Sequence, residues 1–190
     1  MKENVFKNIA SMVSLPPEEV QFYEYYFEHM TISRNTIIEE ENKVPKYLYF
    51  INAGYMRLFY YDDNGYEQTS FFGSPNGFIA SFNALINQTK STENVECITD
   101  CDLLRISYTN TKELIGKSEV FRDFSLAMIQ QALSAPDYRA KDLATLSAEQ
   151  RYKKMLDSQP QLVQNIPLLY IASFLGIKPQ SLSRIRKQIK

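Results

Sequence analysis

The sequence predicts an α+β fold: an antiparallel β-barrel, then one long helix, then a helix-turn-helix at the C-terminal end. Three observations predict this order. Short β-prone runs separated by turn signals occupy the chain from Thr31 to Ser107. A longer helical pattern begins at Ser118, and two short amphipathic segments on either side of a glycine follow after Ile166.

Two helices are expected before the barrel. Val5–Val13 has the pattern of a short helix, and Pro16 and Pro17 begin a second one that we expect to reach His29. Turn signals such as Asp62–Gly65 separate the strands that follow. About eight strands are expected from the spacing. Seven runs can be delimited: Thr36–Glu39, Tyr47–Asn52, Tyr55–Tyr61, Tyr66–Phe72, Phe78–Leu85 (with a helical turn at Phe82–Ile86), Val95–Thr99 and Leu103–Ser107.

The long helix from Ser118 is expected to pack on two partners, because it carries two apolar series at helical spacing. One partner can be the barrel, and the other is most simply the same helix of a second subunit. Pro136 interrupts the pattern, so we expect a kink or break there. Ser147 with Gln150 predicts a capping box that begins a further helix. The two series are Phe121/Phe124/Met128 and Leu126/Ile129/Leu133.

The C-terminal segment has the spacing of a helix-turn-helix. Pro167 can begin its first helix, because a first-turn residue needs no N–H donor. Gly176 can end that helix in the left-handed conformation. Pro179 begins a second helix, which small Ala172 allows to cross close to the first. The apolar stripes are Leu168, Ile171, Ala172 and Leu175 in the first helix, and Leu182, Ile185 and Ile189 in the second.

The outward face of the second helix carries side chains that suit duplex DNA. At about 100° per residue, Gln180, Ser183, Arg184 and Lys187 lie opposite the apolar stripe. Gln and Arg can form paired hydrogen bonds with adenine and guanine edges, whereas Ser and Lys suit phosphates or single base contacts. No Asp or Glu occurs after Asp157. The pattern therefore predicts a helix that enters the major groove, with an ordinary helical hairpin as the alternative.

Charge is distributed unevenly along the chain. The net charge is −1, but residues 137–190 contain 10 Lys and Arg against 4 Asp and Glu, which is a net charge of +6. Residues 1–136 contain 11 Lys and Arg against 18 Asp and Glu, which is a net charge of −7. A basic C-terminal part behind an acidic body is typical of a nucleic-acid-binding protein with a separate sensing or scaffolding domain. A solvated basic face without a partner is the alternative.

Composition argues against several other classes. No stretch approaches the roughly 18 apolar residues of a membrane span, and the first residues lack the apolar segment of a signal peptide, so we expect a cytoplasmic protein. Cys97 and Cys101 are too few for an iron–sulfur cluster or a structural zinc site, and we expect no metal and no cofactor. A cupin-type enzyme is the alternative on a small barrel, but it needs several histidine ligands and His29 is the only histidine. A Ser-His-Asp site meets the same objection, so we expect no enzyme.

The barrel, the long helix and the helix-turn-helix together resemble the cyclic-AMP receptor/fumarate–nitrate regulator (Crp/Fnr) family of bacterial transcription factors. LYFINAGYMRLFYYDDNGYE is similar to the family's second and third sheet hairpins, and IASFLGIKPQSLSRIRK is closely similar to its helix-turn-helix. The resemblance implies a cyclic-nucleotide-binding-like β-roll (a jelly-roll barrel) over residues 1–117, a dimerisation helix over 118–146 and a DNA-binding domain over 147–190. It also implies a homodimer on a palindromic operator in double-stranded DNA, with RNA polymerase as a further partner and no membrane.

The resemblance places the family's DNA-contacting positions on the second helix. Arg184 falls on the family's usual base-reading arginine, and Lys178 occupies the cap position, where it can touch a phosphate. Further phosphate contacts can come from Arg186, Lys153 and Lys154. No strands follow the second helix to form a wing, so a ligand-sensing or protein-interaction module that has lost DNA binding is the alternative function. The predicted DNA-binding residues are Lys178, Pro179, Gln180, Ser181, Ser183, Arg184 and Lys187.

The effector site departs from the family pattern. Members that bind cyclic nucleotides hold the ribose with a Gly-Glu pair and the cyclic phosphate with an Arg-Ser or Arg-Thr pair ten residues on. At that spacing this chain has Ala80 and Ser81, then Ser91 and Thr92. A buried phosphate without its arginine should cost several kcal/mol, so we expect an effector other than cyclic AMP, or an aromatic-filled core. The candidate pocket residues are Phe71, Phe72, Phe78, Ser81, Phe82, Ser91 and Thr92.

Overall fold

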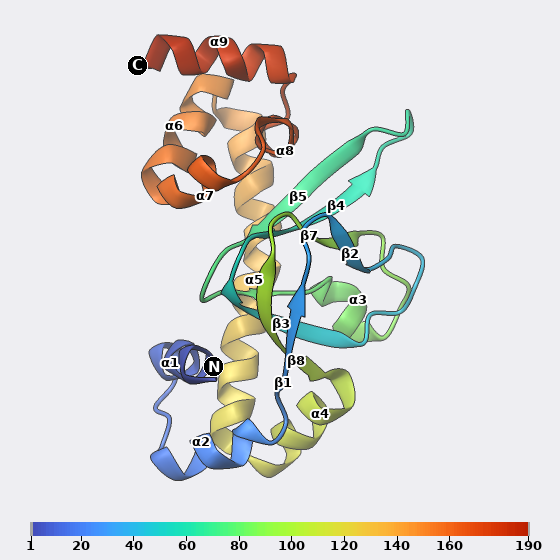
Figure 1. The fold of residues 1–190 in the computed structure, drawn as a ribbon, viewed down its shortest axis with the longest axis vertical. Helices are drawn as coiled ribbons and strands as arrows, with labels where there is room; N and C mark the ends of the chain where they lie inside the picture. The colour runs from blue at the N-terminus through green and yellow to red at the C-terminus, as the bar shows by residue number, and fades with distance from the viewer. Residues whose placement is uncertain (1, 190) are drawn as a thin grey trace.

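Two antiparallel four-stranded sheets form the centre of the computed structural model, which describes residues 2–189 (Figure 1). The strand order is β1-β8-β3-β6 in the first sheet and β2-β7-β4-β5 in the second. This β-roll, followed by a long helix and a helical C-terminal part, confirms the predicted α+β fold. The strands are β1 (Glu28–Ile32), β2 (Thr36–Glu39), β3 (Tyr47–Ala53), β4 (Met56–Tyr61), β5 (Glu67–Gly73), β6 (Phe78–Ile79), β7 (Asn94–Cys97) and β8 (Cys101–Ser107).

The hairpin between β4 and β5 forms where the turn residues predicted it. Asp62 Oδ1 accepts hydrogen bonds from the backbone N–H of Asn64 (2.9 Å) and of Tyr66 (3.0 Å), which closes the turn. Gly65 adopts a φ of 79°, a left-handed conformation that a glycine takes without strain. The hairpin projects beyond the barrel at the end where the C-terminal helices lie (Figure 1).

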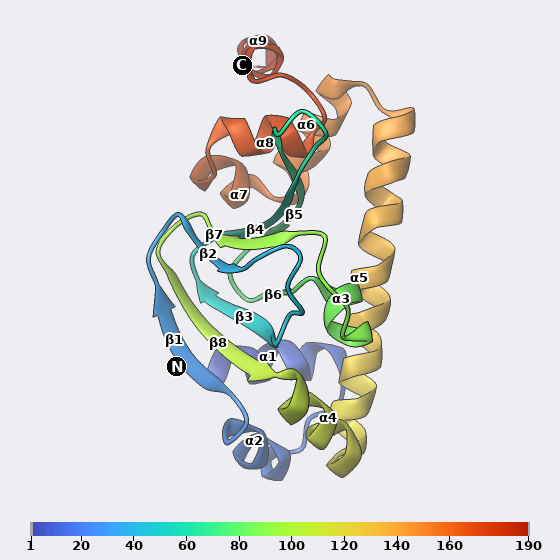
Figure 2. The same cartoon turned by 90° about the vertical axis from the view of Figure 1, so that its right-hand side faces the viewer.

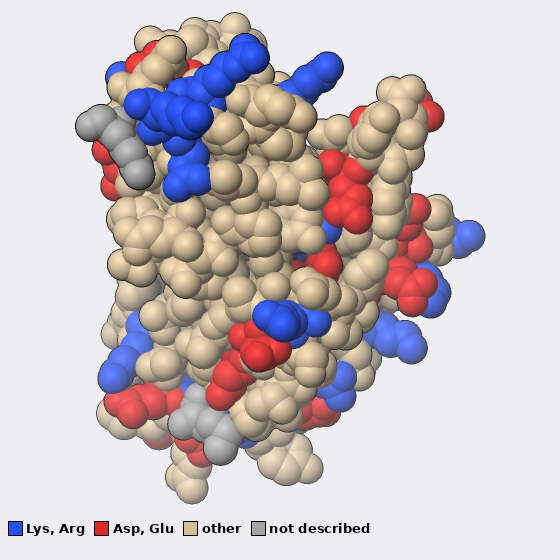
Figure 3. All heavy atoms as spheres, turned by 45° about the horizontal axis from the view of Figure 1, so that its top comes forward, with Lys and Arg blue, Asp and Glu red and all other residues tan. Residues whose placement is uncertain are grey.

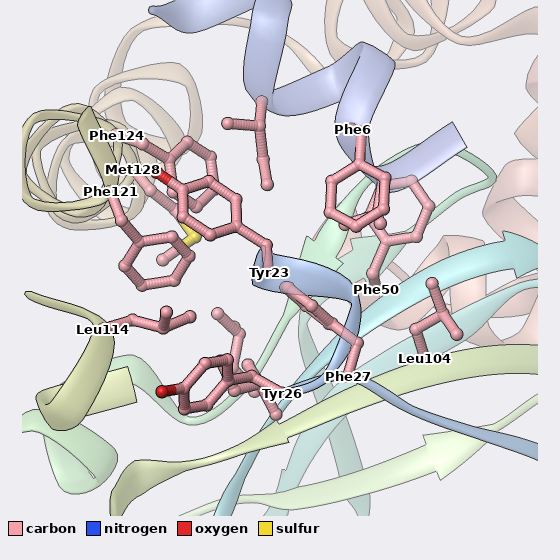
Figure 4. Close-up of a cluster of buried hydrophobic side chains, with 14 of the residues drawn as sticks. Phe6, Tyr23, Tyr26, Phe27, Phe50, Leu104, Leu114, Phe121, Phe124 and Met128 are labelled. Carbon is pink, nitrogen blue, oxygen red and sulfur yellow. The ribbon is translucent and has the colours of Figure 1, made fainter. Parts of the chain in front are cut away.

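An aromatic core joins the N-terminal helices to the barrel and to the long helix. The helices on this side are α1 (Glu3–Met12), α2 (Pro17–Glu24), α3 (Phe82–Asn87), α4 (Tyr108–Lys117) and α5 (Glu119–Thr145). Figure 4 shows side chains from α1, α2, α5 and the strands pointing toward one another in one buried cluster. The rings of Tyr23 and Phe121 lie 5.3 Å apart, and Tyr23 Oη and Ser118 Oγ are hydrogen-bonded at 2.7 Å. The first half of α5 is therefore part of the core of the barrel domain.

Helix α5 begins as expected at Ser118, whose hydroxyl accepts a hydrogen bond from Phe121 N–H (3.1 Å). Pro136, where we expected a kink or break, lies inside the helix, which continues to Thr145. The expected break is wrong, because the exposed Pro136 removes only the hydrogen bond to Ala132 while the surrounding helical bonds persist. Figure 2 shows α5 as one continuous helix along the molecule. No helix within residues 2–189 is long and apolar enough to cross a membrane.

The second N-terminal helix is shorter than the sequence indicated. It ends at Glu24, and His29 lies in β1, where its backbone pairs with Leu104 of β8. The expectation of a helical His29 in front of the barrel is therefore wrong. The physical reason is the long-range pairing of β1 with β8, which no local signal in this aromatic stretch reveals. His29 Nε2 lies 3.0 Å from Asp102 Oδ1 across the same pair of strands.

The C-terminal helices form a second core against one end of the barrel. They are α6 (Ala148–Ser158), α7 (Pro160–Asn165), α8 (Leu168–Phe174) and α9 (Pro179–Ile189). The capping box of Ser147 and Gln150 is confirmed, since each side chain bonds the backbone of the other residue. Helix α7 was not predicted. Phe72 and Ile98 of the barrel belong to the same buried cluster as these helices, so the two parts of the chain share a core.

Candidate nucleic-acid interface

Helices α8 and α9 meet across a tight turn at Gly176, as the sequence predicted. Gly176 has a φ of 66°, and its N–H donates to Ser173 O at 3.0 Å. The next N–H, that of Ile177, donates to Ala172 O at 3.0 Å. These two bonds satisfy the last carbonyls of α8 and turn the chain toward α9.

Helix α9 is held against α8 by the predicted apolar stripe. Leu182 is completely buried, and Ile185 and Ile189 are half-buried in the same cluster as Ala172. The carbonyl of Lys178 accepts the first helical hydrogen bonds, from Ser181 N–H (3.0 Å) and Leu182 N–H (3.2 Å). One side of α9 is thus fixed, and the opposite side faces outward.

The predicted DNA-binding residues lie together on that outward side. Lys178 and Gln180 are exposed at the beginning of α9, and Ser181, Ser183, Arg184 and Lys187 are exposed along it, while Pro179 is half-buried. Among residues 2–189, no protein group forms a hydrogen bond or an ion pair with the side chains of these seven residues. Figure 3 shows Lys and Arg side chains gathered at the C-terminal end of the molecule. The face can therefore donate hydrogen bonds and present positive charge to a ligand.

Four other basic residues of the C-terminal part have protein partners, whereas Lys141 on α5 is exposed. Lys153 pairs with Glu149 at 2.6 Å, and Lys154 pairs with Asp142 at 2.6 Å. These two lysines were expected near phosphates, but their charges are compensated inside the protein. Within residues 137–189, most of the cations without a protein partner lie on α9 or directly before it: Lys178, Arg184, Arg186 and Lys187.

Two arginines counted in the basic C-terminal third have internal roles that the sequence did not reveal. Arg139 Nη2 donates to Thr69 O (3.2 Å) and to Phe174 O (3.1 Å), which joins α5 to β5 and α8. Arg151 donates to Leu146 O (2.6 Å) and Leu175 O (3.1 Å). Burial lowers the pKa of Arg139 from its usual value. Nothing in their local sequence distinguishes these arginines from solvent-exposed ones.

The candidate effector residues are only partly brought together. The hydroxyls of Ser81 and Ser91 are hydrogen-bonded at 2.9 Å, so the two positions expected to face one ligand are adjacent. Both side chains are buried and Ser91 also bonds Glu93 O at 2.7 Å, while Thr92 is exposed. The two hydroxyls satisfy each other, and neither supplies a positive charge for a phosphate.

The four candidate phenylalanines lie in different places. Phe71 packs inside the barrel cluster, but Phe72 points to the other side, where its ring lies 5.2 Å from that of Phe174 in α8. Phe78 packs against Phe50 (5.0 Å) and Phe124 (5.5 Å), between the barrel and α5. Phe82 packs against the same core cluster as Phe78. These contacts agree with aromatic rings that fill a core by packing on one another.

Cys97 and Cys101 are buried free thiols in the barrel, as their sequence context suggested. The Cys97 thiol donates toward the Cys101 sulfur, so the pKa of Cys97 is raised and that of Cys101 is lowered. Within residues 2–189, no group of three or more His, Cys, Asp or Glu side chains is arranged to hold a metal ion.

Comparison with known proteins identifies the barrel domain and the fold. Residues 29–118 match the model of the cyclic nucleotide-binding domain family. FixK2 from Bradyrhizobium japonicum is 18% identical, with a TM-score of 0.75 over 86% of this chain and 84% of FixK2. A protein described as a transcriptional regulator of the crp/fnr family, from Eubacterium rectale, is 17% identical, with a TM-score of 0.73 over 98% of this chain and 87% of that chain.

The catabolite activator protein of Thermus thermophilus is 20% identical, with a TM-score of 0.61 over 96% of this chain and 86% of that protein. No curated protein sequence matches the chain. At these identities the solved structures establish the fold, and the match over residues 29–118 establishes the barrel domain. Residues 29–118 therefore belong to the cyclic nucleotide-binding domain family, in a chain that has the fold of the Crp/Fnr transcriptional regulators.

Proposed function

We propose that the protein is a homodimeric, sequence-specific DNA-binding regulator of transcription. The observation that carries the proposal is the outward face of α9, where Gln180, Ser183, Arg184 and Lys187 are exposed without protein partners among residues 2–189. Leu182 anchors the opposite side of the helix, so the face is presented in a fixed orientation. A helix of this kind reads base edges in the major groove when it follows a tight turn.

The proposed dimer uses the exposed apolar series of α5. Leu126 is 55% exposed and Leu133 is 56% exposed, and Ile129 lies half-buried between them on the same side. The spacing of these three residues is that of the contact positions of a two-stranded coiled coil. Pairing two copies of α5 would set two α9 helices about 34 Å apart, one turn of DNA, on a palindromic operator.

The experiment that tests the function begins with selection of bound sequences from a random duplex pool, followed by affinity measurement by fluorescence anisotropy. Arg184→Ala should weaken binding to the selected sequence by about 1–3 kcal/mol and relax its base preference. Lys187→Ala should weaken binding to all duplexes alike and lower the salt slope by about 1. Lys90→Ala is the control, since this exposed lysine lies in a loop of the barrel.

Two outcomes would contradict the proposed roles of these side chains or the proposed function. Equal loss of base preference from Arg184→Ala and Lys187→Ala would show that the two side chains do not divide base and phosphate contacts. A chain that binds no duplex at low or high salt would favour the alternative, a ligand-sensing or protein-interaction module without DNA binding.

The effector that we propose for the barrel is a small molecule other than cyclic AMP. The Ser81–Ser91 hydrogen bond supports this, because Ser91 stands where the cyclic phosphate would need an arginine and Ser81 stands where the ribose would need a glutamate. A regulator of this kind acts in the cytoplasm, as a partner of double-stranded DNA and of RNA polymerase, and carries out no enzymatic reaction.

A further inference from the structure

A buried arginine lies at the junction between the barrel and the helix-turn-helix. Arg57 of β4 is 1% exposed and is the bulkiest of the fully buried side chains. Its Nε donates to Glu96 Oε2 on β7 at 2.5 Å, and its Nη2 donates to the Glu67 carboxylate on β5. Its Nη1 donates to Thr69 Oγ1 at 3.4 Å. All three nitrogens are therefore bonded to groups of the second sheet, as a buried guanidinium requires.

The faces of the same guanidinium are covered from two different parts of the chain. Its central carbon lies 4.1 Å from the ring centroid of Phe59 in β4 and 3.6 Å from that of Tyr170 in α8. A cation between two aromatic rings is attracted to both, and more strongly when water is excluded. Tyr170 is thus the point at which the first helix of the helix-turn-helix touches the ion cluster of the barrel.

Further bonds connect the same two elements around this contact. Ser173 Oγ of α8 accepts a hydrogen bond from Thr69 N–H (2.8 Å) and donates one to Glu67 O (3.1 Å). Arg57 holds the Glu67 side chain while Ser173 holds its backbone carbonyl, so one residue of β5 is fixed from both sides. The Arg139 bonds to Thr69 O and Phe174 O complete the junction from α5.

We propose that Arg57 is a positioning residue for DNA recognition, which holds α8, and through it α9, in one orientation relative to the barrel. The proposal rests on the function proposed above. Specific binding by a dimer needs both α9 helices at a set separation, whereas non-specific phosphate binding does not. A change in β4 or β7 that moves Glu96 would reach α8 through this guanidinium, and a change in β5 that moves Glu67 would reach α8 through the guanidinium and through the Ser173 hydrogen bonds. The barrel would in this way control the recognition helix without touching DNA.

The test uses a pair of variants at Tyr170 in the full-length chain. Tyr170→Leu removes the ring from α8 and leaves all the ion pairs of Arg57 in place, while Tyr170→Phe keeps the ring. Hydrogen exchange of the Thr69 amide reports the junction directly, because that N–H bonds Ser173 Oγ across it. We expect at least tenfold faster exchange in Tyr170→Leu and no change in Tyr170→Phe.

DNA affinity provides the second readout. Tyr170→Leu should lower affinity for the selected sequence at least tenfold and leave affinity for a random duplex unchanged, and Arg57→Met should do the same. Unchanged Thr69 exchange in Tyr170→Leu would overturn the junction, and faster exchange with unchanged specific affinity would overturn the positioning role. If the unmodified chain binds no DNA, the proposed function fails by itself, while the exchange measurement still decides whether Arg57 and Tyr170 hold α8 on the barrel.

Discussion

Leu182 tests how helix α9 is held in place. It is 0% exposed, whereas the other inward-facing apolar side chains of α9 are only half-buried. Leu182→Ala removes the branched end of this side chain from a cluster in which the facing residue, Ala172, is itself small and cannot fill the space. Leu→Ala changes in packed cores destabilise proteins by about 2–5 kcal/mol, and we expect about 3 kcal/mol here.

Thermal unfolding of the full chain, followed by far-ultraviolet circular dichroism, measures this loss. For a chain of this size, 1 kcal/mol corresponds to about 2–4 °C in Tm, so Leu182→Ala should lower Tm by about 6–12 °C. Leu169→Ala is the matched control, because it makes the same change on α8 at a side chain that is 59% exposed. A surface change of this kind should alter the free energy of unfolding by less than about 0.5 kcal/mol.

The comparison between Leu182→Ala and Leu169→Ala shows whether the buried leucine holds α9 in place. A Tm loss in Leu182→Ala no larger than in Leu169→Ala would refute the reasoning that a single buried leucine anchors α9. The orientation of the face assigned to DNA would then have no structural basis.

Two further predictions concern α5 and the barrel. Leu133→Glu should convert a dimer to a monomer in analytical ultracentrifugation without unfolding the chain, because it places a charge on the proposed contact stripe. Leu169→Glu, at a side chain of similar exposure on α8, should leave the dimer intact. Equal effects of the two variants would reject α5 as the interface. Burial raises the pKa of Glu39 in the folded state above its ordinary value of 4.5, so the folded state binds the proton more tightly than the unfolded state does. The stability that this proton contributes is therefore lost as the pH rises from 4.5 through the folded-state pKa. Glu39→Gln removes that titration while keeping an acceptor for Tyr49 Oη (3.2 Å). Urea unfolding should therefore show Glu39→Gln gaining stability relative to the unmodified chain between pH 4 and pH 7, and a constant difference would contradict the assignment.

The helix-turn-helix was predictable because its signals are local. Gly176 adopts the left-handed conformation that its position predicted, and Leu182 is buried where the periodicity placed it. The capping box at Ser147 and the turn at Gly65 are equally local, and both formed. Each of these features depends on residues within one or two turns of one another.

The errors arose where distant contacts decide the structure. His29 lies in a strand because β8, which follows much later in the sequence, pairs with it. The sequence did not single out Arg57, because charged side chains are rarely buried and no local feature reveals a buried partner. Arg57 is buried because α8 covers that face of the sheet, so that four consecutive residues of β4, beginning at Met56, are all buried. A strand buried on both faces has no alternation from which a sequence could reveal its partner.

The uneven charge of the chain would orient the molecule as it approaches DNA. Residues 1–136 have a net charge of −7 and would repel a duplex, whereas residues 137–190 have a net charge of +6. Several of those positive charges are used inside the protein, by Arg139 and Arg151 as hydrogen-bond donors and by Lys153 and Lys154 in ion pairs. Attraction within a Debye length of about 10 Å at 0.1 M salt then depends mainly on α9 and the adjacent Lys178, where most of the C-terminal cations without a protein partner lie. The helix to which we assign base reading would thus also determine which end of the molecule meets DNA first.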